Sequence, residues 1–266
     1  MSGGLAPAAG LELIERIEAH CVRSWPPSAV EYADDGWVLR ATPGLPGRGR
    51  SNHALAPVRS LSPEEIEGAL ERAMTFAGAH GIECGLQVGP LELHIPLLDT
   101  VAARGWEIQQ SVLVMTAEPA AIAADADPAF ELLFVDHVTS EWLATWQCCE
   151  PERANAAAHV DTVFGRMAGG ALFARLDQRA VGIVVERDGI AGLYCLAVNP
   201  AHRRQGLGSK LVRGLLASVS APAVYLQVFS GNPAGLALYD SLGFTEAYRY
   251  CHCRAPTPAL SHNSRA

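Results

Sequence analysis

The chain has 266 residues, a formal net charge of −8, and 49% hydrophobic residues. This length allows two modest domains or one large one, and the composition is that of a chain with a buried core rather than a disordered one. General binding to nucleic acid requires a basic face, so the acidic balance argues against a nucleic-acid partner. The same balance suits cationic ligands such as amines, although it also simply favours solubility.

The N-terminal segment and the cysteines predict a cytoplasmic protein. Met1–Pro7 has no basic region followed by an apolar stretch, so we do not expect a secretory signal. No apolar run approaches the roughly 20 residues that span a bilayer, so no membrane association is expected. Seven cysteines, an odd number spread along the chain, indicate reduced thiols. In a strand, Cys251 and Cys253 would face away from His252, so no metal site is expected there.

In chain order, the first patterned segments are a strand at Ala54–Ala56, a helix at Glu64–Ala77 and a strand at Gln87-Val88. Residues 119–128, rich in Ala, Asp and Pro, have no clear period and predict a linker. A short apolar strand is then expected at Phe130–Val135.

The remaining elements alternate between helix and strand. Ser140 is predicted as the N-cap of a helix through Trp146, and a second helix follows Pro151 to about Met167. Asp188-Gly189 predicts a hairpin turn with positive φ. The other predicted strands are Ala171–Leu176, Ala180–Arg187, Ile190–Val198, Val224–Phe229 and Glu246–Arg254, and the other helices are Ser209–Val219 and Pro233–Ser241. This mixture around a hairpin meander predicts an α+β or mixed α/β fold.

The first half of the chain echoes the second at an offset of about 140 residues. Gln87-Val88 corresponds to Gln227-Val228, and Ala54–Ala56 to Cys195–Ala197. The helices after these strands correspond as well, and Gly105-Trp106 stands near the position of Gly243-Phe244. We infer a tandem duplication with a diverged first copy: domains at residues 1–118 and 129–256, a linker at 119–128 and a flexible tail at 257–266.

The most informative segment is Val198–Gly208, between an apolar strand and an amphipathic helix. Gly206 and Gly208 let the backbone approach a ligand closely, and the free amides of a helix start attract an anion. A P-loop would need Gly-Lys-Ser/Thr here, and a dinucleotide fingerprint would need glycine at Leu211. For Gly-x-Gly alone, a turn without a ligand is the alternative.

Arg203–Gly208 resembles the acyl-CoA pyrophosphate loop of the GNAT superfamily of N-acetyltransferases, whose pattern is Gln/Arg-x-x-Gly-x-Gly/Ala. Val198-x-Pro200 and Leu211-Val212 fit as well. The downstream residues that resemble the family's second block are Gln227-Val228, Asn232-Pro233-Ala234, Leu238-Tyr239 and Leu242-Gly243-Phe244. The resemblance implies two GNAT-like domains in tandem, each a central, mostly antiparallel, splayed sheet flanked by helices.

The resemblance also implies roles for individual residues in an acetyl-CoA-dependent transfer, in which an amine attacks the thioester directly. The strand before the loop splays from the next, and the backbone of Leu196, Ala197 and Val198 pairs with the pantetheine arm. Asn232 contacts pantetheine, and Tyr239, against the cofactor, is the general acid unless it only packs its helix. An amide of Leu196 or its neighbour stabilises the oxyanion. The residues implied to cradle the pyrophosphate are Arg203, Arg204, Gln205, Gly206, Leu207, Gly208 and Ser209.

The general base is left open. Many family members carry a Glu at about the position of Gly192, but no carboxylate occurs between Gly189 and Pro200. Water, or His159 or Asp161 bordering the acceptor site, are the alternatives. Glu186 lies too far along the hairpin, and Cys195 is interpreted as a small strand residue rather than a nucleophile.

The first half lacks this chemistry. Its loop, Val58–Glu65, has no glycine and opens its helix with two carboxylates, which stabilise the helix but repel a pyrophosphate. Leu98–Gly105 contains no tyrosine. We therefore expect the first half to bind no CoA. Arg48–Asn52 resembles a segment of little-characterised tandem GNAT proteins and either shapes the acceptor pocket or forms a surface loop.

The leading hypothesis is an acetyl-CoA-dependent N-acetyltransferase, without a metal, that acts on a small-molecule primary amine. The alternatives are a protein acetyltransferase for lysine or N-terminal amines, and an acyl-CoA-sensing module without turnover. No feature of the sequence specifies an oligomeric state.

Overall fold

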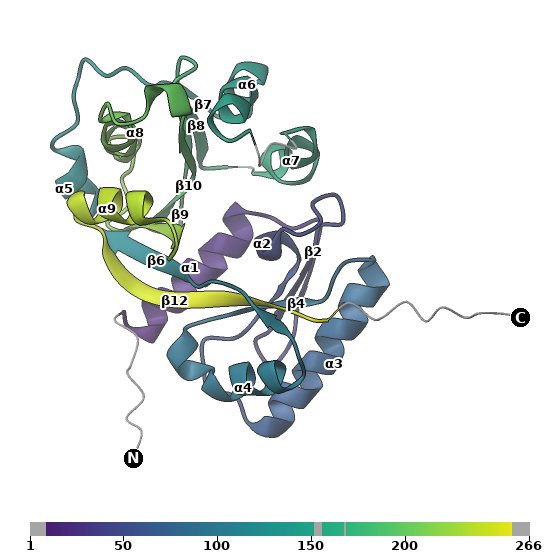
Figure 1. Cartoon of the computed structure of the whole chain (residues 1–266). Helices are drawn as coiled ribbons and strands as arrows, with labels where there is room; N and C mark the ends of the chain where they lie inside the picture. The colour runs from purple at the N-terminus through teal and green to yellow at the C-terminus, as the bar shows by residue number, and fades with distance from the viewer. Residues whose placement is uncertain (1–8, 152–155, 168, 257–266) are drawn as a thin grey trace, which may run out of the picture.

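A computed structural model (Figure 1) describes residues 9–151, 156–167 and 169–256. Within these residues, a single sheet of twelve strands runs through the molecule in the order β1-β2-β3-β4-β12-β6-β11-β10-β9-β8-β7, with β5 pairing on β12. Helices pack against it, so the predicted mixed class is confirmed.

The elements are divided between two halves of the chain, residues 9–118 and 119–256. The first half contains α1 Leu11–Ser24, β1 Ala29–Tyr32, β2 Val38–Ala41, α2 Gly49–Asn52, β3 Ala54–Leu55, α3 Pro63–His80, β4 Gly85–Val88, η1 Leu91–Leu93, α4 Ile95–Ala103, β5 Glu107–Ile108 and β6 Val112–Ala117. The second half contains α5 Pro119–Ala123, β7 Leu133–Val135, α6 Ser140–Cys149, α7 Ala156–Thr162, η2 Phe164–Arg166, β8 Ala171–Leu176, β9 Ala180–Arg187, β10 Ile190–Val198, η3 Pro200–His202, α8 Leu207–Leu216, β11 Val224–Phe229, α9 Pro233–Ser241 and β12 Thr245–Arg254.

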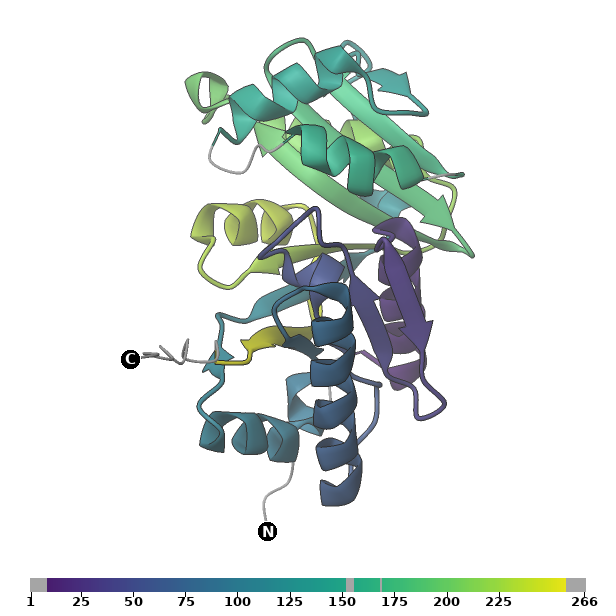
Figure 2. The ribbon, with the colours of Figure 1, turned by 90° about the vertical axis from the view of Figure 1, so that its right-hand side faces the viewer.

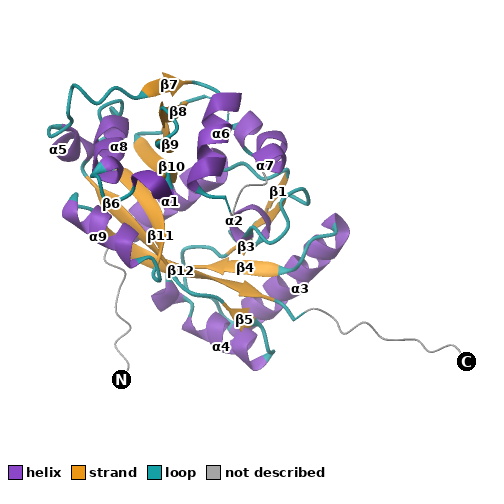
Figure 3. Ribbon diagram, turned by 45° about the horizontal axis from the view of Figure 1, so that its top comes forward, coloured by secondary structure: helices purple, strands orange, loops and turns teal. Residues whose placement is uncertain are grey.

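The second half is a layered structure with helices on both faces of its strands. Figures 1 and 3 show α6 and α7 on one face, and α8 and α9 on the other. Because both faces are covered, six consecutive residues of β9, Ala180–Val185, are buried. α8 buries Leu211, Val212, Leu215 and Leu216, which form one side of the helix.

The two halves exchange their last strands. β6 pairs antiparallel with β11 from Val112↔Phe229 to Ala117↔Val224. β12 pairs with β6 and continues past it to β4, where Cys251 lies opposite Val88. Figure 1 shows this long yellow strand crossing from the second half into the first. The sheet is therefore continuous across the expected boundary at residue 118, which remains a prediction as a domain limit.

Helix α1 also joins the halves. Ile14, Ile17 and Cys21 pack in one core with Trp142 and Phe173 of the second half. In Figure 2, α1 stands beside the green strands of the second half. Its apolar face thus stabilises contacts that neither half makes alone.

Two local expectations are corrected. The predicted linker contains helix α5, and after it Asp125 and Asp127 form ion pairs with Arg213 and Lys210 of α8, at 3.3 and 3.0 Å. A five-residue helix is too short to show a period in the sequence. The N-cap of α6 is Thr139 rather than Ser140, because the Thr139 side chain accepts a hydrogen bond from the Trp142 amide at 3.2 Å.

The hairpin turn is confirmed, because Asp188 and Gly189 both have positive φ, 53° and 69°. The second predicted helix is shorter than expected: it is described as α7, and the turn η2 follows before Met167. Residues 152–155 of the predicted helix and the expected tail at 257–266 lie outside the described residues.

Candidate active site

Strands β10 and β11 diverge after a short contact. They pair in parallel only at Ala191↔Val224 and Gly192↔Tyr225. Beyond this point β10 has an irregular register against β9, and Cys195 adopts a φ of 50°, which is unusual outside glycine. The predicted splay is therefore present, and Leu196–Val198 have no ladder with β11.

The loop after β10 places a helix start beside this opening. Arg204 and Gly206 have positive φ, 64° and 74°, and Gly206 is the N-cap of α8 without a side-chain hydrogen bond. The amides of the first turn are therefore left without a capping side chain. Gly208 packs closely, because an added Cβ would stand 3.0 Å from the end of the Leu238 side chain of α9.

The side chains of the loop are mostly solvent-facing. Arg203, Arg204 and Gln205 are exposed, and Leu207 is buried. The Arg203 Nε donates a hydrogen bond to the Val198 carbonyl at 3.1 Å, which ties the loop to the end of β10. Ser209 is half-buried in the first turn of α8.

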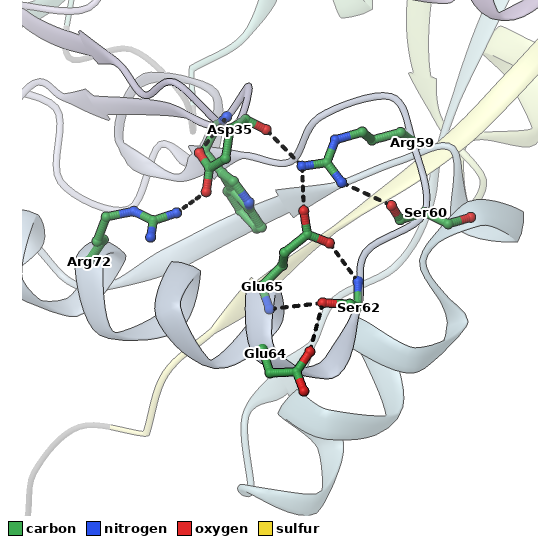
Figure 4. A network of polar contacts seen from close by, with 8 residues as sticks. Asp35, Arg59, Ser60, Ser62, Glu64, Glu65 and Arg72 are labelled. Carbon is green, nitrogen blue, oxygen red and sulfur yellow. Dashed lines mark hydrogen bonds and ion pairs between the residues drawn. The ribbon is translucent and has the colours of Figure 1, made fainter.

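The corresponding helix start in the first half is closed by its own side chains (Figure 4). Ser62 Oγ accepts from the Glu65 amide at 3.2 Å, and the Glu65 carboxylate accepts from the Ser62 amide at 2.7 Å. Arg59 adds an ion pair to Glu65 at 2.8 Å, and its hydrogen bond to that carboxylate holds the pKa of Glu65 below its ordinary value. A carboxylate thus occupies the place where an anion would bind.

A cavity of about 400 Å³ lies next to this first-half loop. Three carboxylates line it, those of Glu15, Glu18 and Asp35, against the guanidinium groups of Arg23 and Arg59. This excess of carboxylates over guanidinium groups disfavours the binding of a pyrophosphate.

Helix α9 carries Asn232 and Tyr239. Asn232 is the N-cap of α9, and its side-chain oxygen accepts from the Gly235 amide at 3.0 Å. The Tyr239 ring packs on Phe244, with centroids 6.0 Å apart. Burial raises the pKa of Tyr239 to about 12, so its phenol is protonated at neutral pH.

The structure explains the absence of a carboxylate at Gly192. A Cβ there would lie 2.8 Å from the Tyr225 hydroxyl and 2.9 Å from the Tyr194 ring. Two tyrosines therefore fill the space in which a glutamate side chain would lie.

Of the two acceptor-site candidates, His159 is not accessible. It is 3% exposed, and its ring packs on Trp146 and Trp25 with centroids 5.1 and 6.4 Å away. Aromatic packing covers the imidazole, and its expected contact with an amine stays a prediction. Asp161 is exposed on α7. Glu186 accepts a hydrogen bond from the Ser220 amide at 2.9 Å.

A polar cluster at the junction of the halves was not predicted. Arg50 of α2 donates to Gln227 Oε1, and the Tyr250 hydroxyl donates to the same oxygen at 2.9 Å. Arg40 donates in the same way to Gln87 Oε1 at 3.0 Å. The repeated Gln-Val dipeptides were the sequence signal for these positions, but they do not indicate the arginine partners.

The alternative that Arg48–Asn52 forms a surface loop is wrong. The segment contains helix α2, and Ser51 and Asn52 are buried. Asn52 holds it in place by donating to the Leu45 carbonyl at 2.8 Å and accepting from the Thr42 amide at 2.6 Å.

Among the described residues, no helix is long and apolar enough to cross a membrane. The same residues contain no group of three or more His, Cys, Asp or Glu side chains arranged to hold a metal. Cys251 and Cys253 are buried on one face of β12, with their sulfurs 3.9 Å apart.

Known proteins resemble the chain at two scales. Over 60 residues the chain is 43% identical to the ribosomal protein bS18 alanine N-acetyltransferase of Escherichia coli. The matched stretch is 21% of this chain and only 40% of that enzyme. A GCN5-related N-acetyltransferase structure from Kribbella flavida has a TM-score of 0.63 at 19% identity, covering 92% of this chain and 96% of that one. A tandem GNAT protein from the clavulanic acid biosynthesis pathway has a TM-score of 0.58 at 16% identity, covering 91% and 89%.

These two structures show that the chain has the GNAT fold. The family model described as "Probable histone acetyltransferase Rv0428c C-terminal" matches residues 13–253. Because this match spans most of the chain, the protein belongs to that family of GNAT-type acetyltransferases.

Proposed function

We propose that the protein is an acetyl-CoA-dependent N-acetyltransferase that acetylates the primary amine of a small molecule. The observation that carries this proposal is the position of an uncapped helix start, at Gly206, directly after a strand that splays from its neighbour. The amides of the helix start suit a pyrophosphate, and the unpaired edge of β10 suits the amide groups of a pantetheine arm.

Acetyl-CoA would supply an acetyl group activated as a thioester. The loop residues Arg203–Ser209 hold its pyrophosphate, and the β10 backbone at Leu196–Val198 pairs with its arm. Asn232 orients the start of α9 beside that arm through its cap. An amide beside the irregularity at Cys195, that of Leu196, donates to the thioester carbonyl oxygen.

In the proposed reaction, the neutral amine forms a bond to the acetyl carbon as the carbon–sulfur bond breaks. The sulfur leaves with the electron pair and takes a proton from the Tyr239 hydroxyl. The attacking nitrogen loses its extra proton to water, since Gly192 offers no carboxylate and His159 is buried, and the Tyr239 phenolate regains a proton from water.

We also infer that the chain is a tandem GNAT protein with a first half that binds no CoA. In support, both halves share the order strand, helix, strand, helix, and β3 and β4 pair in parallel as β10 and β11 do. The Ser62–Glu65 capping box and the acidic cavity oppose phosphate binding in the first half.

A protein N-terminus is the second candidate acceptor. It is favoured by the 60-residue similarity to an enzyme named for acetylating the alanine of ribosomal protein bS18. A protein lysine acceptor has no comparable support beyond the family's description.

The experiment is thiol release from acetyl-CoA in the presence of a panel of small amines, with short peptides bearing a free N-terminal alanine or a lysine as the second arm. Release with the small amines supports the proposal, whereas release with peptides alone supports protein acetylation. Tight acetyl-CoA binding without release in either arm would indicate a sensing module.

Calorimetry is expected to find one acetyl-CoA site per chain. Gly206→Val should weaken binding at least about tenfold, because a β-branched residue is strongly disfavoured at a φ of 74°. Ser62→Ala in the first half is the matched control. It should lower stability by about 1 kcal/mol through the lost cap and leave acetyl-CoA affinity unchanged. A second site, lost in the Ser62 variant, would contradict the inference about the first half.

A further inference from the structure

Arg50 lies at the point where β10 and β11 separate. Its guanidinium donates to Gln227 of β11, two residues beyond the last pairing with β10. It also stands 5.6 Å from the Tyr194 ring of β10 and 5.5 Å from the Trp25 ring. The first half therefore places a cation across the opening in the second half.

This guanidinium has hydrogen-bonding capacity left over. It carries five N–H donors and donates to Gln227 Oε1, the same oxygen that the Tyr250 hydroxyl bonds. Its contacts with the Trp25 and Tyr194 rings are cation–π contacts, which do not require its N–H donors. As a whole residue, Arg50 is half-buried rather than fully enclosed.

Among the described residues, the cationic groups around Arg50 outnumber the carboxylates. No carboxylate among the described residues forms an ion pair with Arg50. Glu18, the buried acid of this cluster, accepts from Tyr248 at 2.6 Å and from Gln87 at 3.3 Å, and a second cation, Arg40, is 1% exposed beside it. The guanidinium groups of Arg40 and Arg50 thus share the one carboxylate of Glu18. Because a partly desolvated cation is stabilised by an anion, a further anion at Arg50 would be favourable.

We propose that Arg50 binds a carboxylate of the acceptor, so that the substrate class is small amines that also carry a carboxylate, such as amino acids. This inference rests on the proposed N-acetyltransferase function. A guanidinium matches a carboxylate with two parallel hydrogen bonds, and its place at the opening leaves the amine directed towards the splay. Arg50 is then a residue that determines specificity, not one that reacts.

The test compares each of several α-, β- and γ-amino acids with its own carboxamide by thiol release. The native protein should prefer the acids by about ten- to a hundredfold in kcat/KM, the range of a charge-assisted hydrogen-bond pair. Arg50→Met should remove this preference by lowering activity on the acids alone, and Arg50→Lys should keep part of it. Arg104→Met, at an exposed arginine paired with Glu67, is the control and should change neither substrate.

Equal activity on acids and carboxamides in the native protein would overturn the proposal while leaving the acetyltransferase function intact. So would an Arg50→Met variant that loses activity on both substrates in proportion, because that is the result of a purely structural role. If no pair releases thiol although other small amines do, this proposal is contradicted and the proposed function stands; if no small amine releases thiol, the proposed function itself is contradicted. Calorimetry of the same acids with the native protein and with Arg50→Met then decides whether Arg50 binds carboxylates.

Discussion

Replacing Tyr239 with Phe is expected to slow thiol release by about 10²–10⁴-fold, the usual contribution of a positioned general acid. The acetyl-CoA affinity should change little, because the ring and its contact with Phe244 remain. Stopped-flow or endpoint thiol detection gives the rate, and calorimetry gives the affinity. Tyr32→Phe is the control, since Tyr32 is 63% exposed on β1 and should leave both quantities unchanged.

An unchanged rate in the Tyr239 variant, with turnover intact, would show that this tyrosine only packs α9. The pH dependence adds a second criterion. Burial raises the pKa of Tyr239 to about 12, so the phenol holds its proton through the neutral and mildly alkaline range. The native rate should therefore not fall there through loss of this proton.

A chain restricted to residues 129–256 is expected not to fold into a stable, cooperative unit. It would lose β6 and with it six residue pairs along β11, and it would expose the surface of the second half that α1 covers. It would also lose the pairing of the end of β12 with β4. A domain has a free energy of unfolding of only about 5–15 kcal/mol, so we expect the free energy lost with a central strand to exceed it.

The measurement is thermal unfolding by circular dichroism, with acetyl-CoA titration as the functional readout. A chain of residues 9–256 is the control, since it keeps every element that the structure describes, and it should unfold cooperatively and bind acetyl-CoA. A cooperative transition in 129–256, together with acetyl-CoA binding, would show instead that the second half is an independent domain and that the strand exchange contributes little.

The sequence predicts those parts of the candidate site whose conformation depends only on residues near them in the chain. Gly206 and Gly208 are selected by a backbone conformation and a close approach that few other residues allow, so a short motif specifies the loop. The same holds for the Asp188-Gly189 turn and for α8, whose apolar positions repeat at the helical period. The α6 cap was misplaced by one residue because Thr139 and Ser140 are both suitable caps.

The arginine cluster was beyond sequence reasoning. Arg50 meets Gln227 across 177 positions of the chain, and Arg40 meets Gln87 across 47. A side chain of this length can reach many partners, so its local sequence contains no information about which one it binds. The blocked position at Gly192 is similar: the glycine is visible in the sequence, but one of the two tyrosines that occupy the space, Tyr225, comes from another strand.

The sequence by itself determined the mixed class, the order of most elements and the glycine-rich loop, because local backbone preferences and apolar periodicity set these features. The tertiary structure alone decided that β6 and β12 change places between the halves and that α2 sets a cation at the splay. The sequence of a strand does not specify which strand it pairs with, because an apolar strand such as β6 can pair with any suitable sheet edge. Only the total burial and hydrogen bonding of the folded chain select β11 and β12 as its neighbours.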